Sequence, residues 1–145
     1  MYQWAQEIDN PLVPLDIPLS VSGTFGEPRS THFHLGVDIK TQGKEGWEVK
    51  SVRPGYVSRI RVSTSGYGKT LYIDHPNKTT TVYAHLKKFA PKIEKLVKTL
   101  QYQKESYTLQ QFPKKREITI DKGEVIGYSG NTGSSSGPHL HFEVR

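Results

Sequence analysis

The chain contains six histidines, and two of them lie two positions apart near its end, in the segment GPHLHFEVR. Apolar and polar residues alternate through this segment, which is the period of a β-strand with one buried face. Such alternation sends His139 and His141 to the same side of a sheet. The two imidazoles are therefore either a metal ligand with its neighbour or a polar surface, and the segment alone does not decide between them.

Two further segments place chemically useful residues at suggestive positions. The segment HLGVD supplies His34 and Asp38, with Gly36 between them. On a straight strand such positions lie about 13 Å apart, too far to share an ion, but a glycine permits a bend. The segment VYAHL places His85 at the end of a β-branched and aromatic run, where alternation predicts that it shares a face with Tyr83. Taken singly, HxxxD also fits a structural ion pair, and His85 also fits a partly buried edge histidine.

The absence of cysteine restricts any metal site in this chain to His, Asp or Glu ligands. Two histidines, one aspartate and an open position for water are the ligand types of a catalytic zinc site. A closed set of four ligands would instead be structural, with His32 as the spare candidate nearby. The chain has no HExxH motif, so a histidine off the metal, with a pKa near neutrality, is the expected proton carrier. His75 precedes a proline in a predicted turn, and we expect it to face solvent.

Together the segments HLGVD, YAHL and SGNTG followed by GPHLHF resemble, in the same order, the signature blocks of the LytM/lysostaphin-type zinc peptidases, the M23 peptidases. The resemblance implies that His34, Asp38 and His141 bind Zn²⁺. It also implies that His85 and His139 are the catalytic pair that flanks the reacting water and the scissile carbonyl. The activity it implies is that of a zinc metalloendopeptidase that hydrolyses peptide cross-links or bridges of bacterial peptidoglycan.

Composition and resemblance together predict the fold class. The chain is only 34% hydrophobic and holds 13 glycines and 9 prolines, which is typical of short strands joined by turns. We expect a mainly β, LytM/lysostaphin-like fold in which antiparallel sheets form a groove, with one inserted amphipathic helix. We expect residues 1–20, which carry three prolines, to form an extended arm. The peptidase domain would then span 21–145, with a helical insertion at about 89–116 that resembles a version found in Bacteroidetes.

Local patterns predict the individual elements. Residues 69–74 and 79–85 flank HPNK and are expected to form a hairpin, and 47–52 is expected to pair with 55–62 around Arg53, Pro54 and Gly55. Apolar residues at helical spacing predict a helix over 90–107, with Pro91 at its first position. Further strands are expected at 117–120 and 125–128. A Gly/Ser loop then leads into the last strand.

Charge and targeting signals bear on partners and location. The net charge of +6 suits an anionic polymer, either a cell wall or a nucleic acid, but a solvated helix face explains many of the lysines, and we expect no nucleic-acid partner. We expect a peptidoglycan peptide as the partner, no transmembrane segment and a monomer. An exported location is expected, in the periplasm, the cell envelope or outside the cell, although no leader lies within these residues. The alternative function is a non-catalytic or latent module that binds wall peptides or activates an amidase.

Overall fold

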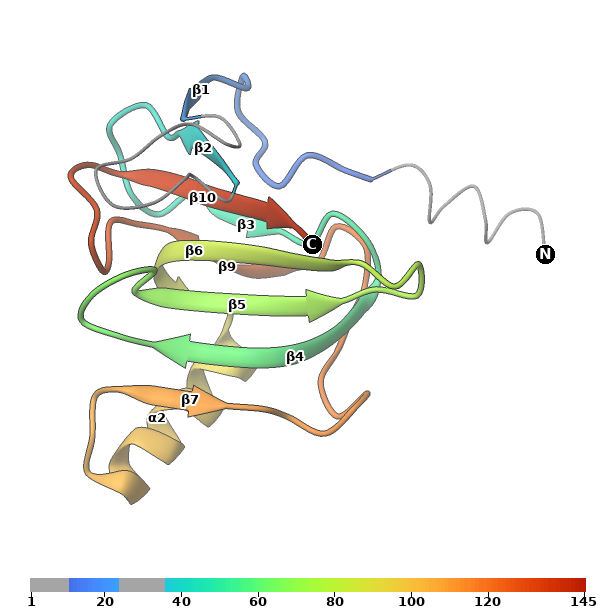
Figure 1. Cartoon of the computed structure of the whole chain (residues 1–145), viewed down its shortest axis with the longest axis vertical. Helices are drawn as coiled ribbons and strands as arrows, with labels where there is room; N and C mark the ends of the chain where they lie inside the picture. Colours follow the sequence, from blue (N-terminus) through green and yellow to red (C-terminus); the bar gives the residue numbers. More distant parts are fainter. Residues whose placement is uncertain (1–10, 24–35) are drawn as a thin grey trace.

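The computed structural model describes residues 11–23 and 36–145. These residues form a mostly antiparallel β-sheet with one helix (Figure 1). The elements, in chain order, are β1 (Val21–Gly23), β2 (Val37–Lys40), β3 (Glu48–Lys50), β4 (Gly55–Val62), β5 (Lys69–Asp74), β6 (Thr80–Phe89), α2 (Pro91–Lys104), β7 (Leu109–Gln111), β8 (Thr119–Ile120), β9 (Val125–Ser129) and β10 (His139–Val144). The expected mainly β architecture with a single helix is confirmed.

The sheet places the chain's last strand in the middle of the molecule. Its main path runs β1-β2-β10-β6-β5-β4-β7, and neighbouring strands pair antiparallel. In β10, His141 lies opposite Asp38 of β2 on one side and opposite Ala84 of β6 on the other. The three sequence segments that could carry chemistry therefore end on adjacent strands, although they are far apart along the chain.

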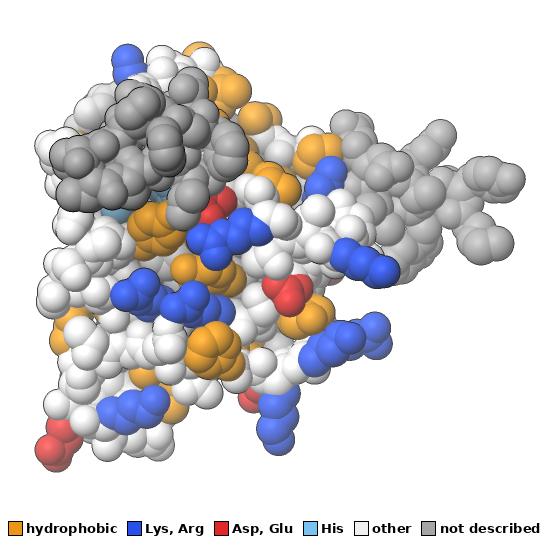
Figure 2. All heavy atoms as spheres, in the orientation of Figure 1, with side chains coloured by type: hydrophobic (Ala, Val, Ile, Leu, Met, Phe, Trp, Pro, Cys, Tyr) orange, Lys and Arg blue, Asp and Glu red, His pale blue; other side chains and the backbone are white. Residues whose placement is uncertain are grey.

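A second layer covers one face of this sheet. Strands β3 and β9 pair with each other, and β9 also pairs with the end of β6. In Figure 1 helix α2 lies behind the sheet, so that the opposite face of β10, β6, β5 and β4 is turned toward the viewer. The core lies between the layers, where Ile60, Leu71 and Ile126 are fully buried, together with Ile93 of the helix. The viewer's face of the sheet carries Lys and Arg side chains interspersed with hydrophobic ones (Figure 2).

The predicted helix is confirmed over Pro91–Lys104. Pro91 occupies the first turn, where its missing N–H costs nothing. The carboxylate of Glu94 accepts a hydrogen bond from the backbone N–H of Phe89 (2.9 Å), which ties the helix start to the end of β6. The helix ends where Glu105 adopts a left-handed conformation (φ 48°).

One predicted strand pairing and the content of the predicted insertion differ from the structure. The hairpin of β5 and β6 is confirmed, but β3 pairs with β9 rather than with β4. The reason is that Ser51, just after β3, exchanges backbone hydrogen bonds with the turn before β9, at Gly123 and Glu124, so the chain leaves β3 along the second layer. The segment predicted to be a helical insertion also contains a short strand, β7, which extends the main sheet beside β4.

Part of the segment predicted to be an arm lies against the sheet layers. The backbone N–H of Leu12 donates to the carbonyl of Val52 (2.9 Å), and the carbonyl of Pro14 accepts from Lys50 (2.8 Å). Leu15 is buried in the core. Within the described residues, we find no helix with the length and apolar character that crossing a membrane requires.

Candidate active site

Asp38 and His141 meet across neighbouring strands. The Oδ1 of Asp38 lies 3.0 Å from the Nδ1 of His141 and 3.5 Å from the Nε2 of His139. His141 is buried at 3% exposure, so this contact is shielded from solvent. The third predicted metal ligand, His34, and the spare candidate His32 lie outside the described residues.

The two predicted catalytic histidines lie against this pair. The ring centroids of His85 and His139 are 4.7 Å apart, and those of His85 and His141 are 6.0 Å apart. Four of the five residues predicted for the site, from three separate segments of sequence, therefore form one cluster.

His85 reaches the cluster through an unusual backbone conformation. Its φ is 59°, in the left-handed region that residues with a Cβ seldom adopt. The strand pairings of β6 shift register around this point. As a result, Tyr83 packs against Phe142 on the core face (5.4 Å between centroids), whereas His85 turns to the opposite face. The prediction that His85 and Tyr83 share a face is wrong, because the left-handed residue breaks the alternation.

The Gly/Ser loop at 130–138 orients both catalytic histidines. The Nδ1 of His85 lies 2.8 Å from the carbonyl oxygen of Thr132, and the Nδ1 of His139 lies 2.8 Å from that of Gly137. A carbonyl oxygen only accepts, so each contact places the ring proton on Nδ1 and leaves the lone pair on Nε2. Thr132 is itself anchored, since its hydroxyl donates to the carbonyl of Leu86 (2.7 Å). Both histidines thus offer a proton-accepting nitrogen.

The environment of His85 suits that role. Burial lowers the pKa of His85 to about 4, an effect that its hydrogen bond to Thr132 opposes. Its imidazole is therefore neutral at neutral pH and able to accept a proton.

A buried carboxylate holds the far side of His141. The Nε2 of His141 donates to Oε1 of Glu143 (2.8 Å), Tyr67 donates its hydroxyl to the same oxygen, and the Nε of Arg145 donates to Oε2 (2.7 Å). Burial alone would raise the pKa of Glu143, but these three hydrogen bonds lower it to about 2. An ionised Glu143 holds one ring proton of His141 on Nε2. Burial lowers the pKa of His141, but its hydrogen bonds to Asp38 and Glu143 together raise it above the usual value, so Nδ1 also donates to Asp38, and a metal ion would displace that proton.

Glu143 and Tyr67 were not predicted to belong to the site. The signal for Glu143 was present, because strand alternation places it on the same face as His139 and His141. For Tyr67 the flanking Gly66 and Gly68 favour an ordinary packed turn over a residue that lines the groove. The Tyr67 ring lies 4.8 Å from that of His141 because the loop between β4 and β5 is held by hydrogen bonds of Gly66 to Ser134 and of Tyr67 to the backbone of His85.

The sequence profile of peptidase family M23 matches residues 32–103 and 100–145, most of the chain. The chain belongs to peptidase family M23. As an M23 domain it is 31% identical, over 112 residues, to the DD-carboxypeptidase/endopeptidase Mpg of Neisseria meningitidis. That match covers 77% of this chain and 20% of the Neisseria protein, so the chain spans about a fifth of this relative's length.

Solved structures confirm the M23 fold. A zinc-containing peptidase from Vibrio cholerae superposes with a TM-score of 0.65 at 28% identity, over 90% of this chain and 35% of that one. The catalytic domain of lysostaphin from Staphylococcus simulans superposes with a TM-score of 0.61 at 23% identity, over 97% of this chain and 84% of that one.

The donor atoms in this M23 domain fit a zinc ion. Among residues 11–23 and 36–145, no three His, Asp or Glu side chains make a complete metal-binding group, and the predicted set needs His34. The two described members nevertheless have the right chemistry, since the Nδ1 of His141 and the Oδ1 of Asp38 face each other. A histidine that binds a metal usually donates its other ring N–H to a carboxylate, as His141 does to Glu143.

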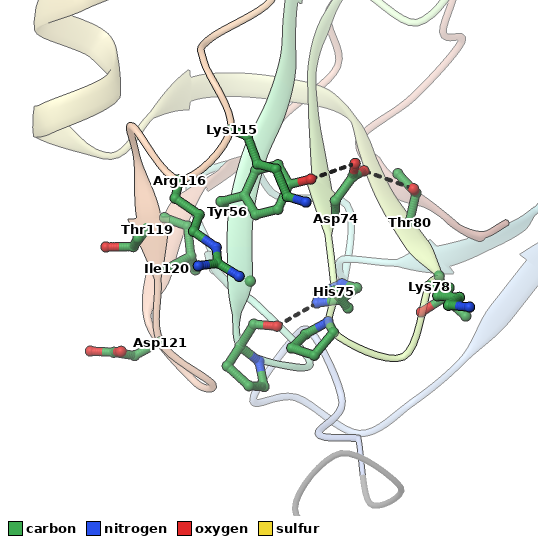
Figure 3. A pocket seen from close by; sticks show the side chains of 14 residues that line it. Tyr56, Asp74, His75, Lys78, Thr80, Lys115, Arg116, Thr119, Ile120 and Asp121 are labelled. Carbon is green, nitrogen blue, oxygen red and sulfur yellow. Dashed lines mark hydrogen bonds between the residues drawn. The ribbon is translucent and has the colours of Figure 1, made fainter.

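A separate hollow at the opposite end of β5 does not carry this chemistry. It has a volume of about 750 Å³, and its lining includes Asp74, His75 and Arg116 (Figure 3). Asp74 accepts hydrogen bonds from the hydroxyls of Tyr56 and Thr80. Asp74 is thus already engaged within the domain.

The exposure of His75, which lines this hollow, differs from what the sequence predicted. His75 is 6% exposed, with its ring nitrogens 2.8 Å from the carbonyl of Pro54 and 2.7 Å from the hydroxyl of Thr81. The expectation that it faces solvent is wrong, because these two partners hold the ring under the hairpin turn.

Proposed function

We propose that this M23 domain is a zinc-dependent endopeptidase that hydrolyses peptide cross-links or bridges of bacterial peptidoglycan. The observation that carries the proposal is the cluster of His85, His139, His141 and Asp38, in which both flanking histidines are held through Nδ1 by backbone carbonyls. The names of related proteins support it, since Mpg is a DD-carboxypeptidase/endopeptidase and the Vibrio neighbour is a zinc-containing peptidase.

The proposed metal ligands are His34, Asp38 and His141. When bound, Zn²⁺ would supply a Lewis acid for the scissile carbonyl and would lower the pKa of a nearby water. The negative charge of Asp38 offsets part of the metal's charge, and Glu143 keeps the ring of His141 in the ligating tautomer.

The proposed catalytic pair is His85 and His139. A neutral Nε2 of this pair accepts the proton of the attacking water, and the same proton is later delivered to the leaving amine. The other member donates a hydrogen bond from Nε2 to the carbonyl oxygen as negative charge develops there, which requires a second proton on its ring. Asp38, 3.5 Å from the Nε2 of His139, stabilises that imidazole when it becomes protonated. One peptide bond and one water thus give a carboxylate and an amine.

The proposed substrate also determines where the protein acts. Peptidoglycan lies outside the cytoplasmic membrane, so we place the protein in the periplasm, the cell envelope or the medium. We propose a monomeric peptidase domain over residues 21–145, with residues 1–20 as an arm.

Digestion of purified wall material tests the function. The domain should release peptides that mass spectrometry identifies, a chelator should stop the release, and added Zn²⁺ should restore it. The His139→Ala variant should release none while still binding the metal. Tight sedimentation of the domain with wall material, without release of any peptide, would instead favour a non-catalytic binding module or a latent form.

A further inference from the structure

Arginine and aromatic side chains continue the candidate active site across the same face of the sheet. Arg145, which directly follows β10, donates to the carboxylate of Glu143 (2.7 Å). The guanidinium carbon of Arg145 lies 5.8 Å from the ring centroid of Tyr72 on β5, and that of Arg59 on β4 lies 4.8 Å from the same ring. Arg59 also lies over Phe112, at 5.6 Å. The contacts run without a break from Glu143 to the far edge of the sheet.

A third arginine belongs to this surface. Arg61 lies opposite Thr70 of β5 and Arg59 lies opposite Tyr72, in regular register. Residues two apart on a strand face the same side, so the side chains of Arg59 and Arg61 are neighbours on the viewer's face. We call Arg59, Arg61 and Arg145 the arginine row.

The arginine row carries more positive charge than its surroundings neutralise. Arg145 pairs with Glu143, but within residues 11–23 and 36–145 neither Arg59 nor Arg61 forms an ion pair. Arg59 donates one hydrogen bond to Gln110, while its Nε is buried with no partner in the described chain. Lys and Arg side chains, interspersed with hydrophobic ones, gather across the middle of this face (Figure 2). The guanidinium groups of Arg59 and Arg61 have no carboxylate partner among the described residues, and an incoming carboxylate would supply one.

The dimensions of the row suit an extended peptide. From β10 to β4 there are three inter-strand steps, which span about 14 Å at the usual strand spacing. This is the length of about four extended residues. Phe112, which is 61% exposed at the far end, offers an apolar contact beside the charges.

We propose that the arginine row binds a carboxylate-bearing segment of the peptide substrate, so that the domain hydrolyses wall peptides with free carboxylates in preference to amidated ones. This inference rests on the proposed function and adds the substrate class. A guanidinium donates two parallel hydrogen bonds to a carboxylate, whereas a carboxamide carries no charge and offers a single acceptor oxygen. The row therefore selects by charge as well as by shape.

A matched pair of cross-linked peptides, one with free carboxylates and one amidated at the same positions, tests this selection. We expect the wild-type domain to show a kcat/KM about tenfold higher on the free acid, as expected for one or two partly exposed charge-assisted hydrogen bonds. The double variant Arg59→Gln/Arg61→Gln should lose this preference by slowing on the free acid alone. The matched control Lys95→Gln/Lys98→Gln removes the same charge from exposed positions on α2 and should keep the preference. Added salt should narrow the wild-type preference, whereas it should change the rates of the arginine variant on the two peptides by the same factor.

The outcomes separate this inference from the proposed function. Equal hydrolysis of both peptides by the wild type, or equal slowing on both in the arginine variant, would overturn the role of the row while leaving the peptidase activity intact. If no peptide is hydrolysed, fluorescence anisotropy of the labelled peptides decides. If the wild type binds the free-acid peptide more tightly and the arginine variant does not, the role of the arginine row stands and the proposed peptidase function is refuted. Equal binding of both peptides would refute both claims. Tighter binding of a mixed-sequence DNA oligonucleotide than of the free-acid peptide would contradict the assignment.

Discussion

Replacing the buried partner of His141 gives the sharpest test of how this site is built. Glu143→Gln keeps the shape of the side chain but exchanges a carboxylate for a neutral amide opposite the Nε2 of His141. A charge-assisted hydrogen bond is about twice as strong as a neutral one, so the loss is about 1.4 kcal/mol. We therefore expect zinc affinity to fall about tenfold, at the lower end of what partners of metal-binding histidines contribute. Glu143→Ala removes the acceptor of His141, Tyr67 and Arg145 together, and should also destabilise the fold by about 3 kcal/mol.

Competition with a chromophoric chelator measures the zinc affinity, and urea denaturation measures the stability. The matched control is Glu105→Gln, an exposed carboxylate at the end of α2 that should change neither quantity. Tyr67→Phe should weaken zinc binding less than Glu143→Gln, because it removes one neutral donor from Glu143 but keeps its charge. Wild-type zinc affinity in Glu143→Gln would refute the reasoning, since Glu143 would then not position His141.

Three further predictions concern other parts of the molecule. His75 is buried and its pKa lies below the unfolded value of 6.5, so the unfolded chain takes up the proton first and the domain should lose stability as the pH falls below about 6.5. In thermal melts, the His75→Gln variant should lose less stability than the wild type between about pH 8 and about pH 5. An equal loss of stability in the two proteins would contradict this prediction. Gly133 has a φ of 76°, and a Cβ there would collide with the backbone of Gly66 and Gly68, so Gly133→Ala should cost at least about 2 kcal/mol in urea and displace the loop that orients His85. Gly137→Ala, at a position with open space around the Cβ, is its control, and equal stability of the two variants would argue against the loop contact. Ile93→Ala, at the fully buried face of α2, should cost about 2–5 kcal/mol, whereas a near-neutral result would show that the helix is not part of the core.

Local pattern was sufficient where one physical rule governs the structure. The alternation in HLHFEVR predicted β10 and a shared face for His139 and His141, because a strand with one buried face has a period of two. The spacing of apolar residues and Pro91 predicted α2 in the same way. The grouping of the site residues, by contrast, came from a family resemblance, since spacing alone could not say which histidine binds a metal.

Features set by contacts between distant segments could not be predicted. The left-handed conformation of His85 accompanies hydrogen bonds from its backbone N–H to the carbonyl of Tyr67 and from its ring to that of Thr132. Neither partner is near it in sequence. The pairing of β3 with β9 could not be predicted for a similar reason. It depends on backbone hydrogen bonds between Ser51 and the distant turn at Gly123 and Glu124. The burial of His75 depends on Pro54 and Thr81, which only the folded hairpin brings to its two ring nitrogens.

The zinc content of the purified domain and its variants tests the central claim most directly. Elemental analysis should find about one zinc per chain in the wild type and in His85→Ala and His139→Ala, both of which should be inactive. It should find almost none in His34→Ala, Asp38→Ala and His141→Ala. Full zinc content in Asp38→Ala and His141→Ala, with both proteins folded, would contradict the account.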